Sequence, residues 1–163
     1  MVHLYLVRHG QSHVNLADLT IEHRDDPLTD LGQEQARRAG KWIASHLHIT
    51  DFVASTVART RQTAEIIGEA IGMRPQYHDG LREVGTCHAD GTPIPALEFE
   101  PFTPEVWGTL DPYTPTTATG ETWLQFRSRV GGFLETLVPT VRRGRAEEPE
   151  PDERRVLAVA HGG

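Results

Sequence analysis

The sequence predicts an α/β domain, a three-layer α/β/α sandwich with a largely parallel central sheet. Short apolar runs alternate with longer segments in which apolar residues recur at helical spacing, as they do in βαβ units. Two of the runs, residues 4–7 and 156–160, are followed closely by a histidine. Ligands of open α/β sheets bind at the C-terminal ends of the strands, so the same pattern predicts where a site should lie.

The first half of the chain should hold three strands and two helices. Residues 2–7 are expected to form a buried strand, and strands are also expected at 51–55 and 75–79. Thr29 is a candidate N-cap for a helix of about 18 residues. A second helix is expected over 58–71, ending before Gly72. The apolar face of the first helix is expected to consist of Leu31, Ala36, Ala39, Ile43 and Leu47.

The second half should hold a loop, a helix and a last strand. Residues 85–119 contain six prolines and show little periodicity, so we expect a substrate lid or loop there. The longest helix should follow Gly120, and a strand over 155–160 should lead to His161. The buried stripe of that helix is expected to be Trp123, Phe126, Val130, Phe133, Leu137 and Val141.

The bulk composition excludes several classes of protein. The chain has 163 residues, which is the size of one domain, and a formal net charge of −7, which argues against nucleic-acid and anionic-membrane partners. It does not exclude a small phosphorylated ligand, because a few convergent arginines make a positive pocket on an acidic protein. No run is long enough to span a bilayer, and the one cysteine, Cys87, fits a reducing cytoplasm. The oligomeric state is not indicated.

Several polar residues follow the expected strands directly. Arg8 and His9 follow the first strand, and Arg59 lies one turn into the helix after the second. Glu83 follows the third strand and His161 the last. The two histidines with Arg8 describe an anion site that holds a nucleophilic imidazole, and the neighbouring cations should lower the pKa of that imidazole. The sequence shows no recognised metal-ligand spacing; the pair at His46 and His48 lacks a third partner.

Each of these residues also has a plainer interpretation. A histidine at the end of a strand is often structural, and Arg59 could be solvated, as Arg61 is expected to be. Asn15 could simply shape a turn. The competitors of Glu83 as a site carboxylate are Asp79, Glu98 and Glu100.

Taken together, the motifs resemble the histidine phosphatase superfamily, also called phosphoglycerate mutase-like. They occur in the family's order across residues 1–162, which makes the combination more specific than any one of them. The blocks are Arg8-His9-Gly10 with Asn15, Pro27-Leu28-Thr29 with Gly32 and Gln35-Ala36, Ser55 to Ala64, Leu81 to Glu83, Gly120-Glu121-Thr122, and His161-Gly162.

The resemblance implies a metal-independent phosphatase that hydrolyses small phosphate monoesters through a phosphohistidine. His9 would be the nucleophile and Glu83 the proton donor, with a small phosphorylated metabolite as partner. No metal is needed, and 2,3-bisphosphoglycerate would be a cofactor only in a mutase. The residues implied to bind the phosphate are Arg8, Asn15, Arg59, His161 and Gly162.

Two other functions stay open. A cofactor-dependent phosphoglycerate mutase would share every catalytic residue, and a phosphate-ligand binding protein could keep the fold without turnover. Residues 85–119 contain acids and no lysine or arginine, which favours hydrolysis over binding of a phosphorylated carboxylate. Relatives continue past the second His-Gly, so we expect residues 1–163 to be a single domain truncated just after His161.

Overall fold

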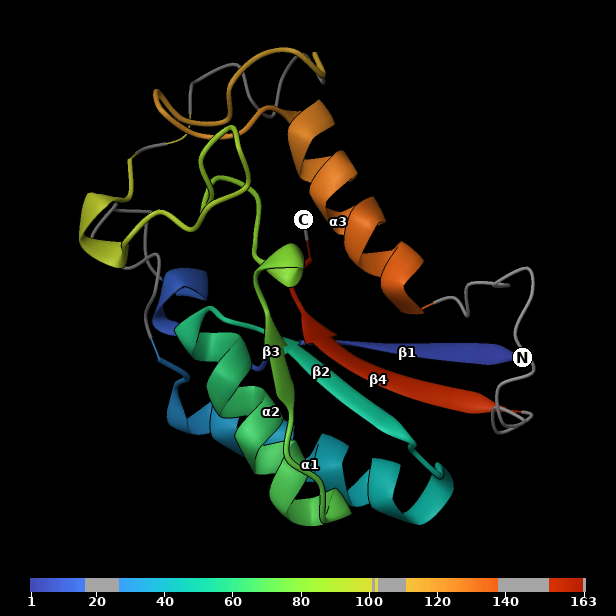
Figure 1. Ribbon diagram of the computed structural model, residues 1–163. Helices are drawn as coiled ribbons and strands as arrows, with labels where there is room; N and C mark the ends of the chain where they lie inside the picture. Colours follow the sequence, from blue (N-terminus) through green and yellow to red (C-terminus); the bar gives the residue numbers. More distant parts are fainter. Residues whose placement is uncertain (17–26, 101, 103–110, 138–152, 163) are drawn as a thin grey trace, which may run out of the picture.

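The structure is a computed structural model that describes residues 1–16, 27–100, 102, 111–137 and 153–162. One four-stranded sheet runs through it in the order β1-β4-β2-β3, with every pair of neighbours parallel (Figure 1). The strands are β1 (Val2–Arg8), β2 (Asp51–Ser55), β3 (Gln76–His78) and β4 (Arg154–Ala160). The helices are α1 (Asp30–His46), α2 (Ala58–Ile71) and α3 (Trp123–Leu137), with short 3₁₀ turns η1 (His13–Asn15), η3 (Asp79–Leu81) and η4 (Ala96–Glu98).

Helices cover both faces of the sheet, which confirms the predicted three layers (Figure 1). α1 and α2 contribute Ile43, Ala64 and Ile67 to a core on one face, packed against Leu157 and Val159 of β4. α3 covers the other face with a second core. That core consists of Val53, Leu81, Phe133, Leu137, Val156 and Ala158.

Local chemistry sets the ends of the two N-terminal helices. The Thr29 hydroxyl accepts a hydrogen bond from the Gly32 amide at 3.1 Å, which satisfies one of the free donors at the start of α1. α2 ends at Gly72, whose φ of 71° lies in the left-handed region that favours glycine. Both signals were predicted from the sequence, and both are confirmed.

The prediction that β1 is fully buried is wrong. Leu4 is 38% exposed and Leu6 is 68% exposed, while Tyr5 and Val7 pack on the α1–α2 core. Leu4 and Leu6 lie on the other face, where the described residues leave them exposed, whereas Val2 at the start of the strand packs against the second core. Leu31, expected on the buried face of α1, is also exposed.

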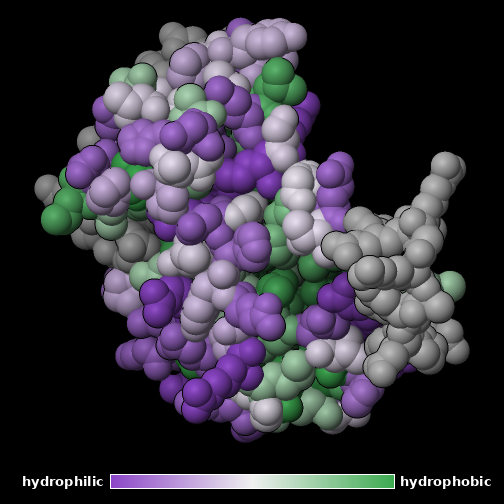
Figure 2. All heavy atoms as spheres, in the orientation of Figure 1, coloured by the Kyte–Doolittle hydropathy of each residue, from purple (hydrophilic) through white to green (hydrophobic). Residues whose placement is uncertain are grey.

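The predicted stripe of α3 is buried only at its end. Phe133 and Leu137 are buried, whereas Trp123, Phe126 and Val130 are half-buried. Trp123 and Phe126 pack on each other instead, edge to face with ring centroids 5.8 Å apart. Figure 2 shows apolar side chains gathered over β2 and β4 beside the end of α3, and polar side chains around them.

The described part of α3 has 15 residues and α1 has 17, and α3 reaches the last described residue before the gap at 138–152, so its being the longest helix stays a prediction. The predicted stripe residue Val141 lies outside the described residues. Among the helices that the structure describes, none has the length and apolar character needed to cross a membrane.

The contrast between Ile43 and Leu31 on α1 is testable. Ile43→Ala should lower the free energy of unfolding by about 2–5 kcal/mol, because it removes a side chain that is 3% exposed from the core. Leu31→Ala should change it by less than about 1 kcal/mol, since that side chain already lies in solvent. Urea unfolding followed by circular dichroism measures both, and equal losses would contradict the assigned faces.

Candidate active site

The parallel register brings three strand ends to one edge of the sheet. Arg8 lies opposite Ala160 in the β1–β4 pair, and Ala54 lies opposite Val159 in the β2–β4 pair. His9 and His161 therefore leave the sheet side by side, and their ring centroids are 5.4 Å apart.

His9 is held with one ring nitrogen directed into the site. Its Nδ1 lies 2.7 Å from the carbonyl oxygen of Gly10, so Nδ1 carries the proton and donates it. Nε2 is then an acceptor, and the Arg59 Nε–H donates to it at 3.1 Å. The residue is only 7% exposed, so its one unprotonated nitrogen lies in a largely dry site.

Arg59 lies between the two histidines. Besides its bond to His9, its Nη2 lies 3.1 Å from Nδ1 of His161, and the residue is 4% exposed. With Nδ1 accepting from the guanidinium, His161 donates from Nε2 to the Ser55 hydroxyl at 3.0 Å. The interpretation of Arg59 as a solvated helix residue is therefore wrong, whereas Arg61 is exposed as expected.

Burial keeps both imidazoles neutral. It is the main cause that lowers the pKa of His9 from 6.5 to about 4, and the charges of Arg59 and Arg8 act in the same direction. Burial also lowers the pKa of His161 well below its ordinary value, helped by Arg59. The sequence predicted the direction for His9 but assigned it to neighbouring charges, which are the smaller cause.

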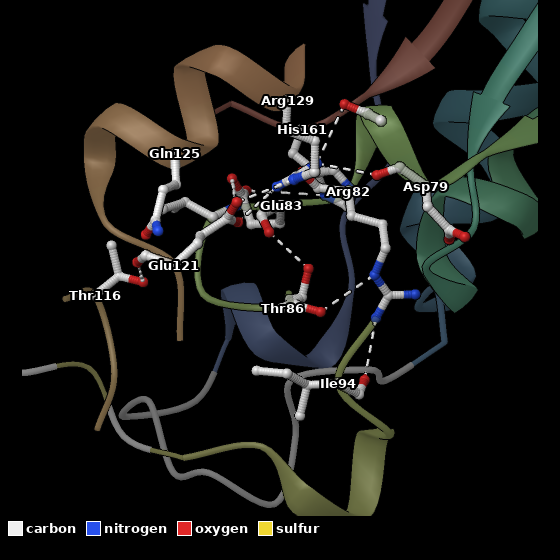
Figure 3. A network of polar contacts seen from close by, with 12 residues as sticks. Asp79, Arg82, Glu83, Thr86, Ile94, Thr116, Glu121, Gln125, Arg129 and His161 are labelled. Carbon is white, nitrogen blue, oxygen red and sulfur yellow. Dashed lines mark hydrogen bonds and ion pairs between the residues drawn. The ribbon is translucent and has the colours of Figure 1, made fainter. Parts of the chain in front are cut away.

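Glu83 reaches the same group from the loop after η3. Its Oε2 lies 3.8 Å from Nδ1 of His161, and its Oε1 accepts from the Val84 amide at 3.0 Å. Figure 3 shows Glu83 and His161 close together. Burial raises the pKa of the Glu83 carboxyl above its ordinary value, although the Val84 amide and the charge of Arg59 oppose the shift. A raised pKa keeps the proton on the carboxyl at a higher pH than in water.

Two of the three competing carboxylates make other contacts, and the third is exposed. Asp79 accepts from the Thr56 hydroxyl at 2.6 Å, and Glu100 accepts from the Thr119 amide at 2.8 Å. Glu98 is exposed within η4. Glu83, in contrast, reaches a site histidine, so the geometry favours it as the site acid.

Arg8 and Gly162 complete the edge. A side chain at Gly162 would place its Cβ 3.1 Å from Cζ and Nε of Arg8, so the glycine leaves room for the guanidinium. Arg8 is close enough to lower the pKa of both His9 and Glu83 by its charge. These contacts place the positive charge of Arg8 beside the nucleophile candidate.

Close packing of the backbone requires a glycine at position 10. A Cβ there would collide with the carbonyl oxygen of Gly32, and a Cβ at Gly32 would collide with the carbonyl oxygen of Gln11. The segment after β1 thus packs backbone to backbone against the first turn of α1. Side chains cannot be accommodated at this contact.

Asn15 lies apart from these residues in the contacts that are observed. It is exposed, and its Oδ1 accepts from the amide and the hydroxyl of Ser12 at 3.0 and 3.1 Å. The side chain therefore closes the turn at η1, as the plainer interpretation expected. Its contact with phosphate stays a prediction.

Sequence reasoning assigned no role to Thr63, which links the nucleophile loop to α2. Its hydroxyl accepts from the Gly10 amide at 3.1 Å and donates to the Arg59 carbonyl at 2.8 Å. The available signal was its position four residues after Arg59, one helical turn along the same face.

The described residues contain no group of three or more His, Cys, Asp or Glu side chains arranged to hold a metal ion. His46 instead stacks on Trp42 with ring centroids 4.6 Å apart. What the site does offer is a neutral imidazole nitrogen, two guanidinium groups and a partly buried carboxyl, a set suited to an anion with a transferable group.

Comparison with known proteins decides the family. The sequence model of the family described as "Histidine phosphatase superfamily (branch 1)" matches residues 4–163. The chain belongs to the histidine phosphatase superfamily. The matched range includes both site histidines, Arg59 and Glu83, and the fold is mixed α/β, as in the solved structures that it resembles.

The curated relatives carry a mutase name, and one protein of solved structure carries a phosphatase name. "Probable phosphoglycerate mutase GpmB" of Citrobacter koseri is 33% identical over 99% of this chain and 70% of that protein. A mycobacterial glucosyl-3-phosphoglycerate phosphatase, Rv2419c, is 25% identical with a TM-score of 0.65, over 98% of this chain and 73% of that one. TTHB049 from Thermus thermophilus is 27% identical with a TM-score of 0.60, over 98% of this chain and 78% of that one.

The neutral state of His9 can be measured directly. We expect its imidazole to titrate with a pKa of about 4, against 6.5 for an ordinary histidine, because burial disfavours the charged ring. The pH dependence of the histidine ring carbon shifts by NMR gives the value. His9→Gln removes the signal and so identifies it, and a midpoint near 6.5 would contradict the buried site.

Proposed function

We propose that this protein is a metal-independent phosphatase that hydrolyses small phosphate monoesters through a phosphohistidine on His9. The observation that carries the proposal is the orientation of His9. Its Nδ1 is committed to the Gly10 carbonyl, and its neutral Nε2 faces Arg59 in a buried site. A nitrogen in that state can attack phosphorus without first losing a proton.

The arginines supply the charge that a phosphoryl group needs. Arg59 and Arg8 carry fork-shaped donors that match the equatorial oxygens of a phosphate, and His161 adds a neutral ring beside them. The Arg59 Nε–H occupies the Nε2 lone pair of His9 in this structure. Phosphate oxygens are stronger acceptors, so binding them would draw the guanidinium away and free that lone pair.

The first chemical step forms a nitrogen–phosphorus bond. The Nε2 lone pair of His9 attacks phosphorus while the bond from phosphorus to the ester oxygen breaks. Glu83, in the protonated form that its raised pKa favours, gives its proton to the leaving oxygen, so that an alcohol departs. The positive charge that develops on the imidazole is balanced by the bound phosphoryl oxygens.

The second step returns the enzyme to its starting state. A water attacks phosphorus, the nitrogen–phosphorus bond breaks, and Glu83 takes the proton from the water. Inorganic phosphate leaves, and His9 is again neutral with a free pair on Nε2. The same carboxyl thus serves as acid and then as base, as microscopic reversibility requires.

A cofactor-dependent phosphoglycerate mutase is the second candidate, because the curated relatives carry that name. Phosphoglycerate adds a carboxylate that a mutase must hold. Residues 85–119 supply no lysine or arginine, and Arg82 beside the site is bonded to the carbonyls of Thr86 and Ile94. This favours phosphate release over transfer to a second hydroxyl.

The remaining assignments belong to the same proposal. A small phosphorylated metabolite is the partner, Asn15 and Gly162 line its phosphate, and residues 85–119 form its lid. The single cysteine and the acidic charge support a cytoplasmic protein without nucleic-acid or membrane partners.

His9→Ala should remove the covalent intermediate and the turnover together. We expect the unsubstituted protein to release phosphate from small esters and to carry radiolabelled phosphate on His9 after a rapid quench without acid. The variant should carry none and should lose at least about 10³-fold in kcat/KM, since it lacks the nucleophile. Arg61→Ala, on an exposed position of α2, is the matched control.

The same assay separates the alternatives. Efficient interconversion of 2- and 3-phosphoglycerate, dependent on 2,3-bisphosphoglycerate, would replace the phosphatase with the mutase. Saturable binding of phosphate esters without label or phosphate release would identify a binding protein.

Glu83→Gln should affect substrates according to their leaving group. Alkyl phosphates need a proton on the departing oxygen, so we expect kcat to fall by about 10²–10⁴-fold with them. Aryl phosphates depart largely unaided and should lose less than about tenfold. Steady-state kinetics on one substrate of each kind measures the difference, and equal losses would assign the acid elsewhere.

A further inference from the structure

Glu83 lies outside the helices and strands, in the loop that follows η3. η3 ends at Leu81, and the loop after it forms a turn in which the Thr86 amide and hydroxyl donate to the Glu83 carbonyl at 3.2 and 2.6 Å. That turn fixes the chain after the acid. The chain before it must be fixed by something else, because a proton donor contributes only when it is held at the leaving oxygen.

The guanidinium of Arg129 fixes the backbone before Glu83. Nη1 of Arg129, on α3, donates to the carbonyls of Asp79, Gly80 and Arg82 at 3.0, 3.1 and 3.1 Å. Nη2 donates to the Arg82 carbonyl as well, at 3.1 Å. The Arg82 carbonyl belongs to the peptide bond that joins Arg82 to Glu83, so the guanidinium restrains the backbone of the acid itself.

Glu121 holds that guanidinium and also reaches the other side of the acid. Its carboxylate accepts from Nη2 and Nε of Arg129 at 2.6 and 3.0 Å, and the two side chains are 1% and 9% exposed (Figure 3). The amide of Gly85, two residues after Glu83, is close enough to the same carboxylate to lower its pKa. The pair therefore bonds the backbone before Glu83 through Arg129 and lies near the backbone after it.

The Glu121 backbone is anchored in turn. Its amide donates to the Cys87 carbonyl at 3.0 Å, and its carbonyl accepts from the amide and hydroxyl of Thr116 at 3.0 and 2.6 Å. The carboxylate consequently has little freedom to follow the Glu83 loop if that loop moves. The guanidinium of Arg129 bonds three backbone carbonyls and both oxygens of this carboxylate, a geometry that lysine cannot reproduce.

We infer that Arg129 and Glu121 are positioning residues for the acid: Glu121 holds Arg129, and Arg129 fixes the backbone that leads into Glu83, so that the carboxyl faces the leaving oxygen. The inference rests on the proposed function, in which Glu83 is that acid. The bonds described above join the pair to each other and to the segment that carries Glu83, so the pair acts on the reaction through Glu83.

A purely structural role would give a different signature. A buried ion pair that only stabilises the fold lowers the melting temperature and the amount of folded protein, and thus reduces activity with every substrate alike. A pair that positions the acid reduces activity mainly where the acid is needed. The leaving group of the substrate distinguishes the two.

Arg129→Lys keeps the positive charge and removes the planar guanidinium with its several N–H donors. We expect kcat to fall about tenfold to a hundredfold with an alkyl phosphate and by less than about threefold with 4-nitrophenyl phosphate, because a misplaced acid slows only the step that uses it. In a Glu83→Gln background the same substitution should cause no further loss with either substrate. Arg127→Lys, two residues away on the exposed side of α3, is the matched control and should change neither rate.

Each outcome decides a different point. If Arg129→Lys lowers kcat equally with the two substrates, or if its loss adds to that of Glu83→Gln, the inference is wrong. The proposed phosphatase activity would not be affected by either result. If Arg129→Lys does not fold, Glu121→Gln keeps the size and one acceptor oxygen and should show the same selectivity at a smaller amplitude. A protein without turnover, or a Glu83→Gln variant without leaving-group dependence, would overturn the proposed function and this inference with it.

Discussion

The position of one buried guanidinium, that of Arg59, determines the arrangement of the site. It donates to His9 on one side and to His161 on the other, and it lies in the first turn of α2 where that helix begins beside β2. A buried cation between two imidazoles requires both rings to be neutral acceptors, which is the state that burial already imposes. The tautomers follow: His9 donates to Gly10, and His161 donates to Ser55.

Arg59 is held in place mainly by contacts of its own backbone and of the loop after β1. Thr63 ties the Arg59 carbonyl to the Gly10 amide, and Gly10 in turn lies against the backbone of Gly32 at the start of α1. The loop after β1, α1 and α2 thus form one unit around His9. Glu83 belongs to a second unit, held by Arg129 and Glu121 from α3 and the segment before it. The two units meet where Glu83 approaches His161.

Much of this could be predicted from the sequence, and the exceptions have physical causes. The bounds of β2 and α2 were predicted because an apolar run, a helical period and a glycine stop coincide there. Leu4 and Leu6 were assigned to the core because a continuous apolar run does not show whether one face or two are covered. The site histidines, Arg59 and Glu83 were found because strand ends converge. Glu121 and Arg129 were not assigned a role. Their contact with the backbone beside Glu83 depends on how the loop between Glu83 and Glu121 folds, and the sequence does not show that.

The hydrogen bond from Arg59 to His9 has a consequence for chemical selectivity. The most reactive lone pair of the site is blocked as long as that bond lasts, so neutral electrophiles such as carboxylic esters or aldehydes meet an imidazole that is already engaged. An oxyanion can displace that bond, because it offers the guanidinium a better acceptor. Discrimination against uncharged reactants is then built into the resting state, before any other part of a substrate is recognised. If His9 is the nucleophile of the proposed phosphatase, this bond disfavours attack on such compounds even without a pocket shaped to exclude them.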